Sequence, residues 1–230
     1  MIDSFILVII RVSKISYEKG AKMNKVNYQV ILDDTLEKIK SRKVVPSLLL
    51  HSCCAPCSSY VIEYLSQHFY ITVFYYNPNI DEREEYKKRA LEQQRLILSM
   101  QTKYPVCFTE GPYDVENYLK IASPLKEEKE GGARCVLCYD LRLRNTAHYA
   151  KEHNFEYFTT TLTISPLKNA QIINEIGEKL QKEYGVPYLF SDFKKKEGYK
   201  RSLLLSKAYN LYRQDYCGCS YSKNRHTDIK

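Results

Sequence analysis

Two nucleotide-binding signatures are missing from this sequence of 230 residues. It contains neither a G-x-x-x-x-G-K-[ST] phosphate loop nor a G-x-G-x-x-G dinucleotide fingerprint, so a requirement for ATP or a nicotinamide is not indicated. Tryptophan is absent, and no internal repeat or low-complexity tract occurs. The length therefore suits one globular domain, or one domain with an extension.

Long hydrophobic runs are also absent. The apolar run at residues 5–10 is too short to span a membrane, and it has no basic region before it and no small-residue cleavage site after it. We therefore expect no secretory signal, no membrane partner and a cytoplasmic location. An amphipathic segment opens at Met23. We expect residues 1–22 to be an over-extended reading frame or a dispensable tail, and residues 23–230 to form the functional domain.

The composition is that of a soluble globular enzyme, with 44% hydrophobic and 27% charged residues. A net charge of +8 fits an anionic partner such as nucleic acid, and it fits a slightly basic enzyme equally well. Eight cysteines raise the question of a disulfide framework. Their clustering, the ample core and the missing secretory signal favour metal-bound or catalytic thiols in a reducing cytoplasm instead.

Strand and helix patterns alternate along the chain. Strands are predicted at residues 48–51, 70–76, 106–109 and 157–163, and helices at 27–43, 58–69, 82–100, 114–121, 134–152, 169–184 and 201–211. This order predicts a single α/β domain with a mainly parallel sheet, of the nucleotide-hydrolase or HUP-like type. The first cysteines, residues 77–79 and residues 161–165 all follow predicted strands. We expect one composite, cysteine-rich metal site at the carboxyl ends of these strands.

Two cysteine groups have the character of metal ligands. Cys135 and Cys138 lie three residues apart at a helix start, so they face the same way, and the helix terminus and Arg134 are expected to favour their thiolates. Alone they also suit a redox pair or half a zinc site. Together with Cys53 and Cys54 they supply four thiolates for a [4Fe–4S] cluster or a tetrahedral zinc. Iron–sulfur is favoured, because adjacent cysteines cannot easily wrap one small ion.

The remaining cysteines allow several interpretations. One glycine between Cys217 and Cys219 makes a tight loop whose disulfide would be strained and easily reduced, as in a redox-active pair. Alternatively these two thiolates join Cys57 around a second iron, or they form only a loose turn. Cys53 and Cys57 also suit small buried apolar positions. For Cys107, on a predicted strand, that packing role is the expectation.

Residues 190–221 combine basic and aromatic side chains. Lysine and arginine bind phosphates, and tyrosine rings stack on unpaired bases, so this region suits single-stranded RNA. A solvated lysine loop followed by a helix that packs its tyrosines internally would have the same composition. The residues alone leave both interpretations open.

Six ordered motifs resemble the cobalamin-independent, iron–sulfur epoxyqueuosine reductase family. They are LLLHSCCAPC at 48–57, FYYNPNI at 74–80, RCVLCYDLRL at 134–143, TTLTISPLK at 160–168, DFKK at 192–195 and YRQDYCGC at 212–219. The resemblance runs from about residue 23 to residue 222. It implies an enzyme that reductively deoxygenates epoxyqueuosine at the tRNA wobble position to queuosine.

The resemblance also implies the site. The ligands of a [4Fe–4S] cluster would be Cys53, Cys54, Cys135 and Cys138. A second iron would lie beside the cluster, with Cys57 as its candidate ligand. Cys217 and Cys219 would form a redox-active pair. The reaction consumes two electrons and two protons, so an external electron donor is needed. We expect Tyr216, Asp215 or Tyr139 to supply protons.

The substrate nucleotide would have to leave the anticodon stack to reach a buried metal, and residues 190–221 would then hold the anticodon arm of the tRNA. Two rival functions remain. One is an iron–sulfur tRNA thiolase, which would need the missing ATP loop. The other is a zinc-stabilised RNA-binding module.

Overall fold

The computed structural model describes residues 26–223, so the predicted extension at residues 1–22 lies outside the described residues. The strands are β1 (Ser47–His51), β2 (Tyr70–Tyr75), β3 (Val106–Glu110) and β4 (Tyr157–Thr160). The helices are α2 (Tyr28–Lys40), α3 (Ala55–Leu65), α4 (Arg83–Ser99), α5 (Val115–Ala122), α6 (Ala133–Glu152), α7 (Ala170–Tyr184), α8 (Gly198–Ala208) and α9 (Ser220–Lys223), with 3-10 turns η1 (Ser123–Leu125) and η2 (Thr161–Ile164).

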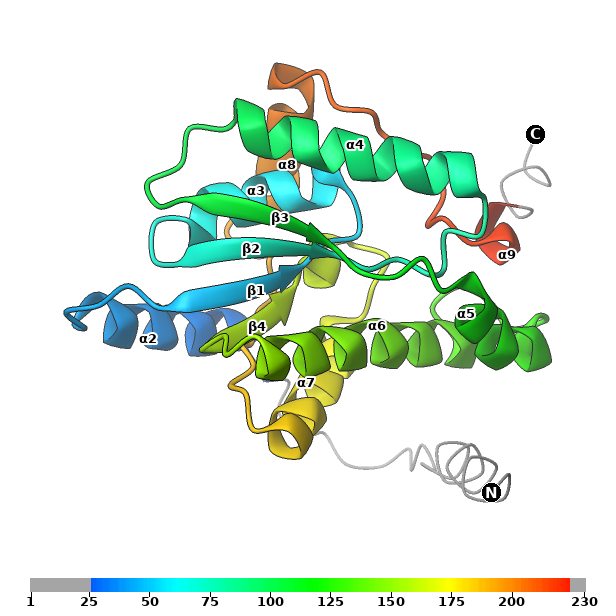
Figure 1. The fold of residues 1–230 in the computed structure, drawn as a ribbon, viewed down its shortest axis with the longest axis horizontal. Coiled ribbons are helices and arrows are strands. Elements are labelled where there is room, and N and C mark those ends of the chain that lie inside the picture. Colours follow the sequence, from blue (N-terminus) through cyan, green and yellow to red (C-terminus); the bar gives the residue numbers. More distant parts are fainter. Residues whose placement is uncertain (1–25, 224–230) are drawn as a thin grey trace.

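The four strands form one parallel sheet in the order β3-β2-β1-β4. This confirms the predicted α/β fold and its parallel sheet. The chain lays β2 and β3 on one side of β1 and later returns to place β4 on the other side. The direction in which strands are added thus reverses between β1 and β4. In parallel sheets a crevice opens outside the carboxyl ends of the two strands where this reversal occurs. Figure 1 shows these ends pointing toward the side of the molecule where α5 and α9 lie.

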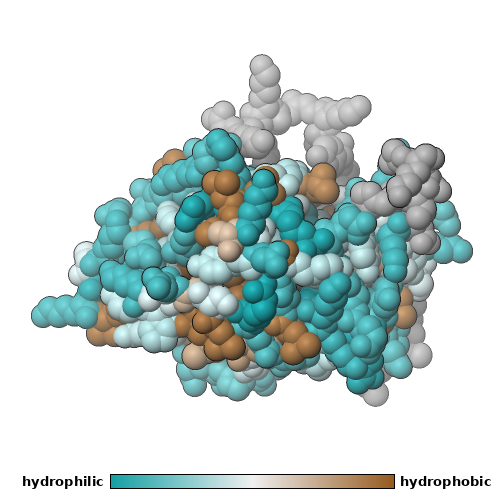
Figure 2. All heavy atoms as spheres, turned by 90° about the horizontal axis from the view of Figure 1, so that it is seen from above, coloured by the Kyte–Doolittle hydropathy of each residue, from teal (hydrophilic) through white to brown (hydrophobic). Residues whose placement is uncertain are grey.

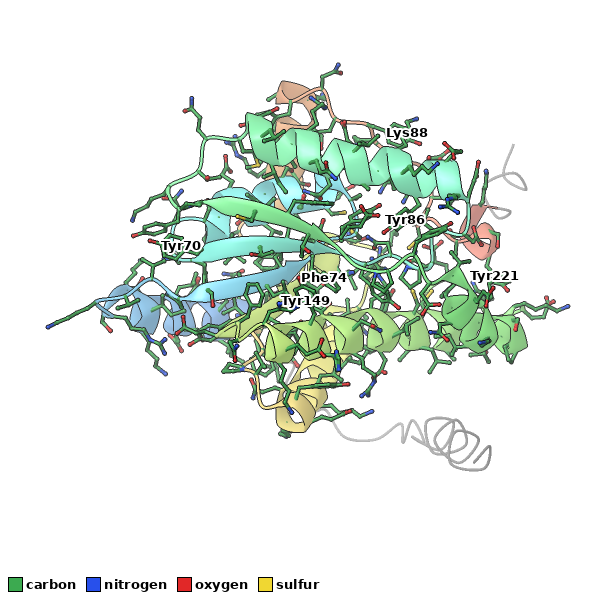
Figure 3. The ribbon with its side chains drawn as sticks, viewed as in Figure 1. Tyr70, Phe74, Tyr86, Lys88, Tyr149 and Tyr221 are labelled. Atoms are coloured by element: carbon green, nitrogen blue, oxygen red, sulfur yellow. The ribbon has the colours of Figure 1, made fainter. Side chains whose placement is uncertain are left out.

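Helices cover both faces of the sheet (Figure 1). Leu48 and Leu50 of β1 face a core formed with α2 and α3, whereas Leu49 faces a core formed with α6 and α7. Phe74 of β2 stacks on Tyr149 of α6 with ring centroids 4.7 Å apart (Figure 3). Continuous apolar strands of this kind are typical of parallel sheets buried on both faces.

Two element boundaries near the predicted site differ from the expectation. The strand predicted at residues 157–163 ends at Thr160, because its hydroxyl accepts a hydrogen bond from the Leu162 amide and the chain turns into η2. Helix α3 begins at Ala55, before the predicted residue 58, since Cys54 caps it in an extended conformation and Pro56 suits the first turn. Both differences bring Cys57 and η2 closer to the ends of the strands.

No helix within residues 26–223 combines the length and the apolar character that crossing a membrane requires.

Candidate metal and redox site

Three thiols meet where β1 gives way to α3. The sulfur atoms of Cys53, Cys54 and Cys57 all lie within 4.8 Å of one another, and those of Cys53 and Cys54 are 3.8 Å apart. In the described part of the chain, no other group of three or more cysteine, histidine or carboxylate ligands is gathered this closely. We call these residues the thiol triad. Cys57 lies in the first turn of α3, where the partial positive charge of the helix start favours an anionic ligand set.

The triad shares its protons unequally. Hydrogen bonds from the thiols of Cys54 and Cys57 lower the pKa of Cys53. The pKa of Cys54 is raised to about 12 and that of Cys57 is raised as well, first of all by their hydrogen bonds to the more acidic Cys53. The first thiolate therefore forms at Cys53. A metal that replaces the shared protons would satisfy all three sulfurs.

A second thiol group lies beside α6. Four cysteines line one small cavity of about 10 Å³, together with Asn79, Arg134 and Tyr139; they are Cys135, Cys138, Cys217 and Cys219. The predicted ligand set joins Cys135 and Cys138 to Cys53 and Cys54; in the structure Cys135 and Cys138 also share this cavity with the Cys217–Cys219 turn. We call these four residues the thiol tetrad. The triad and the tetrad together account for seven of the eight cysteines.

The expectation that Cys135 and Cys138 are readily ionised is wrong for the free thiols. Burial raises the pKa of Cys135, and it raises the pKa of Cys138 to about 12. The charge of Arg134 lowers the pKa of Cys135, as predicted, but burial outweighs it. Arg134 Nη1 donates to the carbonyls of Leu125, Lys126 and Glu128. Its guanidinium lies 4.7 Å from the ring centre of Tyr221. These two thiols ionise only with a metal or a cation close by.

A buried arginine connects the strand ends to the thiols. Arg142, one helical turn beyond Cys138, donates from Nε to His51 Nε2 at 3.2 Å and from Nη2 to Asn77 Oδ1 at 2.5 Å. Burial, with the charge of Arg142, lowers the pKa of His51 to about 3, so the imidazole is neutral. Burial alone would lower the pKa of Arg142, but the nearby thiols of Cys138 and Cys53 raise it. This guanidinium is a fixed counter-charge for sulfur anions.

A larger cavity of about 360 Å³ opens beside the triad. It is lined by sulfur, charged and aromatic side chains, among them Cys53, Cys57, Lys168, Asp215, Tyr216 and Cys217. Two of the predicted proton donors, Asp215 and Tyr216, are therefore in this cavity, whereas Tyr139 lines the small one. Cys217 lines both cavities, so it lies between the small cavity and the larger one.

Lys168 adds a second cation to the larger cavity. Burial would lower the pKa of its ammonium group, but the charges of Cys217, Cys53 and Cys57 outweigh burial and raise the pKa above its usual value. The side chain is half-buried. Sequence reasoning quoted Lys168 only as the end of a motif and gave it no role, and it likewise overlooked His51 and Arg142 as parts of the site. The signal for Lys168 was its place, four residues after the end of the 3-10 turn that follows β4.

Helix α4 holds the C-terminal segment that carries the tetrad's last two cysteines. We call residues 209–223 the strap. Arg89 donates to the carbonyl of Cys217 at 3.3 Å and pairs with Glu85 at 2.6 Å, and the hydroxyl of Tyr212 donates to the same Glu85 carboxylate. The Tyr212 amide donates to Glu92 at 2.7 Å. Lys88 of α4 lies 3.5 Å from the ring centre of Tyr212, on the outer side of the helix (Figure 3).

Known proteins share this chain's sequence over most of its length. Residues 48–225 match the family model described as Epoxyqueuosine reductase QueH. This chain belongs to that family. Epoxyqueuosine reductase QueH of Streptococcus pyogenes is 44% identical over 207 residues, which cover 88% of this chain and 81% of the relative. The namesake of Staphylococcus aureus is 42% identical over 205 residues (87% and 85%), and that of Thermotoga maritima is 35% identical over 195 residues (80% and 95%).

Membership of the QueH family confirms the resemblance drawn from the motifs, and it makes the chain an oxidoreductase. The matched region contains the whole triad and the whole tetrad. Seven soft sulfur donors lie beside the buried Arg142 and the half-buried Lys168, and this donor set suits iron–sulfur clusters and other thiophilic metals. The residues present therefore fit a metal centre in a QueH enzyme.

Cys107 lies apart from this QueH site. It is exposed on β3, so the expectation of a buried apolar role is wrong. The reason is the sheet order, since β3 is an edge strand and pairs only with β2.

Proposed function

We propose that this chain reductively deoxygenates epoxyqueuosine in tRNA to queuosine. The observation that carries the proposal is the position of Cys217, which lines both the tetrad cavity and the larger cavity. A thiol in this position can exchange electrons with a metal centre on one side and with a bound substrate on the other. The family match supports this reaction in particular, and the reaction class requires an external electron donor.

The ligand assignment is part of the proposal. Four cysteines would hold a [4Fe–4S] cluster, namely Cys53, Cys54, Cys135 and Cys138. Arg142 supports this arrangement, because its charge lies near both Cys53 and Cys138. Cys57 would be free to bind a second iron, and Cys217 with Cys219 would form the redox-active pair. When bound, the cluster supplies electrons one at a time at low potential.

Side chains of the protein would donate protons to the substrate and shield the sulfur atoms. Asp215 and Tyr216 line the larger cavity, so either can pass a proton to a group bound there. The pKa of Tyr216 is raised by burial, which keeps its hydroxyl protonated at neutral pH. Tyr139 lines only the tetrad cavity and is better placed to shield the sulfurs.

The strap and α8 would contact the anticodon arm. Lys195, Lys200 and Arg213 are exposed and Tyr199 is 37% exposed, whereas Phe193 is buried in the core. The predicted basic and aromatic region is thus partly core and partly surface. Figure 2 views the molecule from the side of α4 and α8, where hydrophilic side chains prevail and small hydrophobic groups are interspersed. A flipped nucleotide would enter the larger cavity past Tyr199, which lines it.

A zinc-stabilised RNA-binding module is the second candidate. The observation that favours it is the tetrad, because four thiols around one small cavity are the donor set of a structural zinc site. In that case the triad and the larger cavity would have no assigned use. The thiolase alternative has no support beyond the thiols, since the sequence lacks its ATP loop.

One experiment separates these functions. The protein is purified anaerobically, its absorbance near 400 nm and its metal content are measured, and it is incubated with epoxyqueuosine tRNA and a low-potential reductant. Mass analysis of the digested nucleosides should show the loss of one oxygen. A colourless, zinc-loaded protein, or an intact cluster without this mass change, would reject the proposal.

A further inference from the structure

The larger cavity contains a cationic side chain, Lys168, that has no role in the proposed reaction as described above. Lys168 lies in the loop between η2 and α7, and its side chain lines this cavity together with Cys53, Cys57 and Cys217. Among the described residues no carboxylate forms an ion pair with its ammonium group, and no hydrogen bond occupies its Nζ. A half-buried ammonium without a partner retains donors for a ligand.

The backbone holds Lys168 in place. Its amide donates to the carbonyl of Ser165 at 3.2 Å, and its carbonyl accepts from Lys194 Nζ at 3.5 Å. The next residue, Asn169, caps α7 by accepting from the amides of Gln171 and Ile172. The loop is therefore anchored on both sides of Lys168, so the ammonium is presented from a fixed base, as a preorganised donor should be.

Other basic side chains near the site are already engaged. Arg142 is bonded to His51 and Asn77 and does not line the cavity. Arg213 lines it but is exposed and donates to Ser206. Lys194 donates to the carbonyl of Thr163 and pairs with Asp192. Among the described cations of the cavity, Lys168 alone combines shelter from solvent with free donors.

We propose that Lys168 is a catalytic residue whose ammonium donates a hydrogen bond to the substrate oxygen while the bond from that oxygen to carbon breaks. This inference rests on the proposed function. The reaction joins an epoxide, two electrons and two protons to give an alkene and water. Both carbon–oxygen bonds break, the two carbons share a new double bond, and an external low-potential donor supplies the electrons. Negative charge grows on the oxygen when the first bond breaks, and Lys168 stabilises it while keeping its own proton.

The test compares Lys168→Met, Lys168→Gln, Lys168→Arg and the control Lys43→Met. Lys43 is exposed in the turn before β1, at the opposite end of the sheet, so its substitution removes the same charge away from the site. Each anaerobically prepared protein is assayed for kcat and KM with epoxyqueuosine tRNA, for tRNA affinity at two salt concentrations and for absorbance near 400 nm. Wild-type protein is run in parallel, because its inactivity would reject the proposed function itself.

Removing one donor to a developing oxyanion typically lowers kcat by about 100- to 1,000-fold, and we expect this for Lys168→Met and Lys168→Gln. We expect KM, tRNA affinity and absorbance to stay within about twofold of the wild type, since a ground-state contact is not being removed. Lys168→Arg should recover at least about tenfold of the loss because it keeps the charge, and Lys43→Met should resemble the wild type.

Three outcomes would overturn the inference while leaving the proposed function intact. One is a Lys168→Met enzyme whose kcat is within about threefold of the wild type. Another is a raised KM and a weaker, less salt-dependent tRNA affinity with unchanged kcat, which would make Lys168 a phosphate contact. The third is loss of the absorbance near 400 nm in both neutral variants, which would assign Lys168 to the metal centre.

Discussion

Arg142 of α6 donates a hydrogen bond to His51 at the end of β1, across 3.2 Å, and both side chains are at most 1% exposed. The imidazole also contacts the Thr160 hydroxyl through Nδ1 at 2.8 Å and the Tyr76 carbonyl through Nε2 at 3.2 Å. Arg142 also reaches Asn77, whose amide donates to the carbonyl of Ser52. One guanidinium thus ties together the ends of β1, β2 and β4 next to the triad.

Replacing Arg142 by methionine should therefore lower the stability of the metal-free protein. It leaves His51 Nε2 and Asn77 Oδ1 without this donor, and an unsatisfied buried polar atom costs about 1–3 kcal/mol. We expect the free energy of unfolding in urea to fall by at least about 2 kcal/mol. The matched control is Arg144→Met on the same helix, because Arg144 pairs with Asp140 and Glu183 at the surface. Equal losses in the two variants would contradict a special role for the buried network.

The division of roles among the cysteines is testable by colour. Cys135→Ser should abolish absorbance near 400 nm, because it removes one of four proposed cluster ligands. Cys217→Ser should leave the colour and abolish turnover, because it removes one half of the proposed redox pair. Both cysteines line the same small cavity, so the comparison is sharp. Bleaching by Cys217→Ser would instead make that residue a ligand.

Gly218 should not tolerate a side chain. Its φ is +122°, and a Cβ there would lie 2.8 Å from Ile80 Cγ1 and 3.2 Å from Arg89 Nη1. Gly218→Ala should thus move the Cys217–Cys219 turn away from α4, cost about 1–3 kcal/mol of stability and reduce turnover at least tenfold. Urea denaturation and the nucleoside assay measure the two effects. As a control, Gly185 also has a positive φ of +75° but open space around it, so Gly185→Ala should change stability without changing turnover.

The attachment of the strap to α4 should weaken in acid. Hydrogen bonds from Arg95 and from the Tyr212 amide lower the pKa of Glu92 below its ordinary value of 4.5. The stabilisation is therefore complete above about pH 4.5, and it is lost as the pH falls through the lower pKa of the folded state. Limited proteolysis of the metal-free protein should cleave the strap at a constant rate between about pH 6 and pH 5, and progressively faster as the pH falls below about 4.5.

Glu92→Gln should flatten this pH dependence and make the strap more sensitive at neutral pH, because the charge that binds Arg95 is gone. The control is Glu116→Gln, which removes an exposed carboxylate from α5 and should leave the profile unchanged. A Glu92→Gln protein with the wild-type acid profile would show that other carboxylates release the strap.

Sequence patterns predicted the fold well, because apolar strands buried on both faces and well-capped helices carry strong local signals. The same patterns placed β1 and its cysteines at the carboxyl edge of the sheet. They missed the contribution of Arg142, since a buried arginine on a helix looks like any surface arginine until its partners from distant strands are known. They did not predict that Cys135 and Cys138 share a cavity with Cys217 and Cys219, because spacing along the chain does not reveal that α4 holds the strap beside α6.

The strap also sets the order in which the site can be completed. Arg89 and Cys217, which are joined by a hydrogen bond, are 128 residues apart in the chain. A ribosome adds about 5–20 residues per second, so about 6–26 s pass between the synthesis of the two residues. Throughout that interval the strap is missing, and with it the wall of the larger cavity that Asp215, Tyr216 and Cys217 form. The larger cavity beside the triad is therefore completed last, when the strap reaches α4.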